Sequence, residues 1–138
     1  MSEHRRLDIE ALHRGLKASL RHGARAARLI RYCPELIEVL FPEAEHPELM
    51  IYDRAIHAEG LICAATKNIG GDYSEAAEIL LALKPGTMGL KLEERRRMAG
   101  ALFEIDAQTF RRPRWQGQLM WDIVIEIYQS TMRDPFKY

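Results

Sequence analysis

The stretch Leu92–Trp115, LEERRRMAGALFEIDAQTFRRPRW, decides the fold prediction for this chain. Its pattern predicts a helix, a tight turn at Glu104–Asp106 and a second short helix that begins at Ala107. Gly100 supplies the small residue that lets the second helix cross the first at close range. The layout is that of a helix-turn-helix, and no other part of the sequence is as specific.

Each position of this segment has an expected role. Ile105 anchors the turn, Asp106 caps the second helix, and Phe110 points into the core. The charged and polar residues around the turn are the candidates for binding a partner. These candidate partner-binding residues are Arg95, Arg96, Thr109, Arg111, Arg112 and Arg114.

Two features argue against reading of a DNA major groove by this segment. Pro113 disfavours helical backbone at Arg112, which limits the second helix to roughly one and a half turns. Glu104 occupies a turn position that often carries glycine, and its carboxylate would repel phosphate. A recognition helix has to present several side chains to base edges, and this one is short.

The remaining sequence has helical periodicity throughout. Asp8 is expected to cap a first helix, Gly23 to break the chain, and Pro34 to start a short helix. Asp72, with Glu75 three residues on, has the spacing of a capping box. Further helices are expected at about 52–68, where Ile56 is assigned to the apolar stripe, and at about 116–132.

The expected architecture is all-α. Residues 1–138 are predicted to form a single compact orthogonal bundle of seven or eight helices. Residues 91–132 make up its helix-turn-helix-like segment and the final helix.

Composition narrows the class of protein. The 138 residues are 47% hydrophobic and 29% charged, which is typical of a soluble globular domain. No apolar run reaches the roughly 18 residues that span a bilayer, and the first residues lack the apolar region of a signal peptide, so a cytoplasmic location is expected. Cys33 and Cys63 have no metal-binding spacing and are expected to be free thiols.

Charge is unevenly distributed along the chain. Residues 1–33 have a net charge of +5, residues 34–83 of −8 and residues 84–114 of +4. Two arrangements stay open at this stage. The blocks neutralise each other within one fold, or the basic blocks form a surface for an acidic partner. A homodimer that pairs the blocks between two chains is a further option.

The order of several motifs resembles a small helical domain of unsettled function that is common in actinobacterial proteins. The matching residues cover about two thirds of the chain: Arg54-Ala55, Ile69-Gly70-Gly71, Leu80-Leu81-x-Leu83, Pro85-Gly86-Thr87, Glu94-Arg95-Arg96, Ala99 and Asp106-x-x-Thr109-Phe110-Arg111-Arg112. The resemblance implies a regulatory or adaptor module rather than an enzyme. The chain departs from the pattern at Pro113.

The sequence therefore predicts a non-enzymatic interaction module that binds an acidic protein surface through the basic helix-turn-helix-like corner. No catalytic set, metal site or cofactor motif is found. The alternative is a DNA-binding transcriptional regulator that places the same arginines on phosphate. An enzyme would require a polar pocket with perturbed titratable groups, which the sequence does not indicate.

Overall fold

The computed structural model describes residues 7–133, which contain helices and no strand. The all-α prediction is confirmed. The helices are α1 (Ile9–Ser19), α2 (Ala26–Tyr32), α3 (Pro34–Leu40), η1 (Glu43–Glu45, a 3-10 turn), α4 (Ile51–Ile69), α5 (Gly71–Leu80), α6 (Leu92–Ala101), α7 (Ala107–Phe110), η2 (Pro113–Gly117, a π-helical turn) and α8 (Gln118–Arg133).

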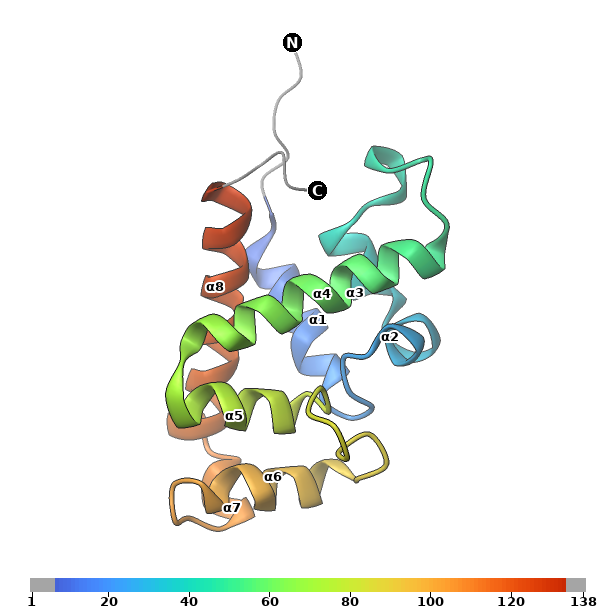
Figure 1. Ribbon diagram of the computed structural model, residues 1–138. Helices are drawn as coiled ribbons and strands as arrows, with labels where there is room; N and C mark the ends of the chain where they lie inside the picture. The colour runs from blue at the N-terminus through green and yellow to red at the C-terminus, as the bar shows by residue number, and fades with distance from the viewer. Residues whose placement is uncertain (1–6, 134–138) are drawn as a thin grey trace.

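The longest helix, α4, lies across the others (Figure 1) and packs against α2, α5 and α8. Its buried face carries Ala55, Ala58, Ile62 and Ala65, and the small side chains of the three alanines allow close approach of the neighbouring helices. Below it in this view lie α5, α6 and α7, with α6 packed between α5 and α7. This lower layer carries the predicted helix-turn-helix-like segment.

Local signals in the sequence place most helix ends correctly. The Asp8 carboxylate accepts a hydrogen bond from the Ala11 N–H at 3.1 Å and caps α1. Gly23 adopts a left-handed φ of 91° in the connection from α1 to α2. Pro34 occupies the first turn of α3, where its missing N–H costs nothing.

Two local predictions are wrong. Asp72 does not cap α5, because Gly70, with φ of 85°, joins α4 to α5 directly and α5 has already begun at Gly71. Ile56 was assigned to the apolar stripe of α4 but is exposed, because the buried stripe follows Ala55 and Ala58.

The segment from α6 to α7 has the predicted geometry. A Cβ atom on Gly100 would lie 2.8 Å from the Ile105 carbonyl oxygen, so the turn crosses α6 at a point where only glycine fits without a shift. The Asp106 carboxylate accepts from the Thr109 N–H at 2.7 Å, and the ring of Phe110 is buried. Glu104 has a left-handed φ of 59°, which explains why related turns favour glycine at this position.

Arg95 lies inside the bundle, only 1% exposed, and donates hydrogen bonds to backbone carbonyls. Its Nε donates to Leu90 O at 3.2 Å, and Nη1 donates to Leu80 O. Its Nη2 donates to Leu20 O at 2.7 Å and to Arg21 O at 3.0 Å.

These bonds connect the carboxyl ends of α1 and α5 to the beginning of α6. Helix ends leave carbonyl oxygens without a partner inside the helix, and a cation is favourable there because of the helix dipole. The prediction that Arg95 contacts a partner is wrong, since this guanidinium is buried and donates its hydrogen bonds to carbonyl oxygens of the same chain.

Replacing Arg95 with Met should lower the free energy of unfolding by about 3 kcal/mol or more, because several buried carbonyls lose their donors. Urea unfolding measures the change. Arg97→Met is the matched control, since Arg97 is exposed on the same helix and pairs only with Glu94. Equal effects of the two substitutions would contradict the role assigned to Arg95.

Gly100→Ala should lower the free energy of unfolding by about 2 kcal/mol, because the added methyl meets the Ile105 and Asp106 carbonyl oxygens. Gly60 provides the control. A Cβ there meets no atom within 4 Å, so Gly60→Ala in the middle of α4 should stabilise the protein by up to about 1 kcal/mol. A neutral Gly100→Ala variant would disprove the close crossing.

Candidate functional site

Arg111, Arg112 and Arg114 form an exposed basic corner where α7 ends and η2 begins. Pro113 causes this arrangement, because it stops α7 and puts Arg112 into extended backbone with ψ of 156°. Within residues 7–133 none of the three takes part in an ion pair. They are the predicted site residues that remain available to a partner.

The other predicted site residues have structural roles. Arg96 is largely covered, and its Nε donates to the Gln116 side-chain oxygen at 2.8 Å, which ties α6 to η2. Thr109 is half-buried, and its backbone N–H donates to the cap of α7. Arg95 is buried. The structure thus brings together only the last three arginines of the predicted set.

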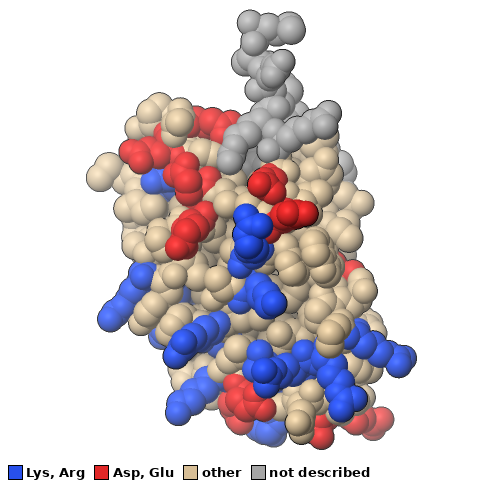
Figure 2. All heavy atoms as spheres, turned by 180° about the vertical axis from the view of Figure 1, so that it is seen from behind, with Lys and Arg blue, Asp and Glu red and all other residues tan. Residues whose placement is uncertain are grey.

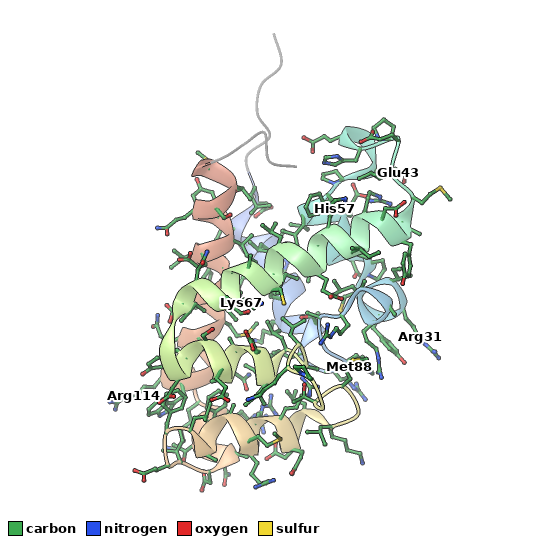
Figure 3. The ribbon with its side chains drawn as sticks, in the orientation of Figure 1. Arg31, Glu43, His57, Lys67, Met88 and Arg114 are labelled. Atoms are coloured by element: carbon green, nitrogen blue, oxygen red, sulfur yellow. The ribbon has the colours of Figure 1, made fainter. Side chains whose placement is uncertain are left out.

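Arg114 lines a hollow of about 270 Å³ beside this corner. Arg114 is labelled in Figure 3, at the edge of the molecule near the start of α5. The walls come from the end of α4, the start of α5, η2 and the start of α8. The lining residues are Ile69, Tyr73, Arg114, Trp115, Gln118, Leu119 and Asp122.

An aromatic wall supports this hollow. The ring centroids of Tyr73 and Phe103 are 4.8 Å apart, and those of Phe103 and Trp115 are 5.1 Å apart, both in tilted contacts. Phe103 belongs to the turn after α6, so the turn holds the rings of α5 and η2 in place. Tyr73 and Ile69 were not predicted as site residues, because they lie about forty positions before Arg114 in the sequence.

The hollow combines an apolar wall with one free cation at its edge. Its volume is close to the lower limit of usual small-molecule pockets, and it has room for one large side chain. The Asp122 carboxylate accepts from the Gln118 amide at 3.0 Å and so has a partner of its own. A ligand that places an apolar group inside and a carboxylate on Arg114 would match this arrangement.

A second basic group surrounds His22 at the other side of the molecule. The His22 ring stacks on Tyr32, with centroids 3.6 Å apart, and the Arg31 guanidinium lies 5.3 Å from the same Tyr32 ring. Partial burial of the imidazole, followed by the charges of Arg21, Arg28, Arg95 and Arg31, lowers the pKa of His22. Figure 3 labels Arg31 on the opposite side from Arg114.

The charge blocks of the sequence neutralise each other only in part. Among described residues, two ion pairs join the middle block to a basic block: Arg25 with Glu59 at 3.4 Å, and Lys84 with Glu75. The other pairs form within blocks. In Figure 2 most basic side chains gather over the lower part of the visible face, with some acidic ones among them, and further acidic ones gather toward the end that carries η1.

Comparison with known protein families, curated proteins and solved structures finds no significant match to this chain. The resemblance inferred from the sequence motifs therefore stays a prediction. None of the described helices has the length and hydropathy required to cross a membrane. In the described part of the chain, no group of three or more His, Cys, Asp or Glu side chains is placed to hold a metal ion.

The pKa of His22 should lie below its ordinary value of 6.5, and neutralising Arg31 or Arg28 with Gln should raise it. NMR titration of the imidazole measures both. Because the folded state disfavours the protonated ring, His22 contributes stability above pH 6.5 that is lost as the pH falls through 6.5 toward the lower pKa of the folded protein. A pKa above 6.5 would refute the basic environment.

Proposed function

We propose that this protein is a non-enzymatic interaction module that binds an acidic segment of a partner protein at the Arg114 corner. The single observation that carries the proposal is the aromatic hollow with an unpaired arginine at its edge. An apolar side chain of the partner enters the hollow beside Trp115. Carboxylates on either side of that side chain pair with Arg111, Arg112 and Arg114.

The two parts of the site contribute differently to binding. Burial of one large apolar side chain contributes roughly 1.5–3 kcal/mol. Exposed ion pairs at the edge contribute about 1 kcal/mol or less each, and they favour acidic over basic segments. The hollow therefore supplies most of the affinity, and the arginines supply the selectivity.

DNA binding by the same arginines is the alternative, and the geometry supports it less. The helix that would enter the major groove is α7, which has only four residues. Phosphate contacts use basic side chains and have no need of an apolar hollow beside them.

Tryptophan fluorescence provides the direct test. The chain has two tryptophans, so Trp121→Phe leaves Trp115 as the reporter in the hollow. This protein is titrated with a synthetic peptide that carries Glu and Asp on both sides of a central Met. A saturable change in Trp115 emission is expected, and it should weaken for a Gln and Asn version of the peptide or a central Ala.

Arg114→Glu should weaken peptide binding by about tenfold or more, because it replaces attraction at the edge of the hollow with repulsion. Arg31→Glu is the matched control, with the same change of charge on the other side of the molecule, and should bind as before. Peptide binding that is absent, or that both substitutions weaken equally, contradicts the proposal. Tight, salt-steep binding of duplex DNA instead would establish the alternative.

A further inference from the structure

An exposed acidic and apolar tip lies at the end of the molecule that carries η1. We define the tip as residues 43–52, which run from η1 into the first turn of α4. Met50 is 72% exposed, and Ile51 and Tyr52 beside it are also exposed. Glu43 and Glu48 in the same ten residues are also exposed. These three consecutive large apolar residues, Met50 to Tyr52, keep much of their surface exposed, so they form an apolar patch outside the core of this chain.

Contacts of Arg54 and Phe41 at the base of the tip hold it in place. The buried Arg54 guanidinium donates to the Phe41 carbonyl oxygen at 3.0 Å and pairs with Glu38 at 3.3 Å. The Phe41 ring contacts the rings of His46 and His57, each with centroids 5.6 Å away. The base therefore orders the tip before any partner arrives, which lowers the entropic cost of binding.

We propose that the partner segment is the tip of a second copy of this chain, so that the protein associates head to tail. This inference rests on the proposed function of the Arg114 corner. The tip has the chemistry that the hollow requires, an apolar side chain flanked by carboxylates. Met50 suits an aromatic wall in particular, because its thioether is flexible and makes favourable contacts with aromatic rings such as Tyr73 and Trp115.

The two surfaces cannot meet within one chain. Figure 3 labels Glu43 and Arg114 at opposite ends of the molecule, with the length of α4 between them. A contact between them therefore joins different copies and uses two different surfaces. Such a heterologous contact either closes into a ring or continues as an open chain of copies.

Charge complementarity supports the same arrangement. The chain is neutral as a whole. The tip carries exposed carboxylates, while Arg111, Arg112 and Arg114 are exposed at the opposite corner, where some acidic side chains also lie. Head-to-tail stacking brings the opposite charges together. Because the charged groups are exposed, the association should weaken as the ionic strength rises.

Sedimentation velocity over a concentration series at low salt tests the proposal. The average mass of the wild-type protein should rise with concentration. Arg114→Glu and Met50→Asp, each by itself, should remain monomeric. Arg14→Glu is the matched control for charge and should associate like the wild type, because Arg14 lies exposed on α1, outside both surfaces.

Mixing the two non-associating variants gives the decisive result. Arg114→Glu keeps an intact tip, and Met50→Asp keeps an intact hollow, so one productive contact remains between them. The mixture should form a species of twice the monomer mass and no larger one. A wild type that stays monomeric, a mixture that does not associate, or an Arg114→Glu variant that still associates by itself would overturn the proposal.

The peptide titration separates this inference from the proposed function. Peptide binding without self-association would reject the second copy as the partner and leave the Arg114 corner as a binding site. Absence of both would reject both proposals.

Discussion

The guanidinium of Arg95 is the interaction on which the rest of this structure depends. It donates only to backbone carbonyls, from the ends of α1 and α5 and from the residues before α6. A buried cation is costly unless hydrogen bonds and favourable dipoles compensate it, and the carboxyl ends of two helices provide both. Arg95 sets the position of α6, and α6 in turn carries the turn, α7 and η2. The hydrogen bonds of Arg95 therefore also influence the position of the candidate site, which follows α6 in the chain.

The corner has the outline of a helix-turn-helix but a different use for its parts. The close crossing at Gly100 and the cap at Asp106 are retained, while α7 stops after four residues. The turn is the part of this segment that shapes the candidate site. Its Phe103 ring contacts both Tyr73 of α5 and Trp115 of η2. The hollow lies beside η2, which follows the short α7. The proposed ligand, a protein segment, has an apolar side chain that such a hollow can accept.

The distribution of charge in the fold depends on which ion pairs form between residues that are close in the sequence. Arg96 and Arg97 pair with Glu93 and Glu94 one turn away on the same helix. These pairs use the carboxylates of α6, and Arg111, Arg112 and Arg114 form no ion pair with any residue that the structure describes. Acidic side chains also gather toward the end that carries η1 (Figure 2). The exposed carboxylates of the tip and the arginines of the corner thus lie at different ends of the molecule, which is the basis of the head-to-tail proposal.

The sequence by itself determined the features that depend on neighbouring residues. Asp8, Gly23, Pro34 and Asp106 act within a turn or so of their own position, so their effects on helix ends were predictable, as was the burial of Phe110. Only the tertiary structure decided which of three consecutive arginines is buried. Successive residues on a helix differ by about 100° in direction, and Arg95 faces inward because carbonyls 15 and 75 residues away lie there. The hollow is likewise a product of tertiary contact, since Tyr73 and Trp115 meet through Phe103 across three separate segments.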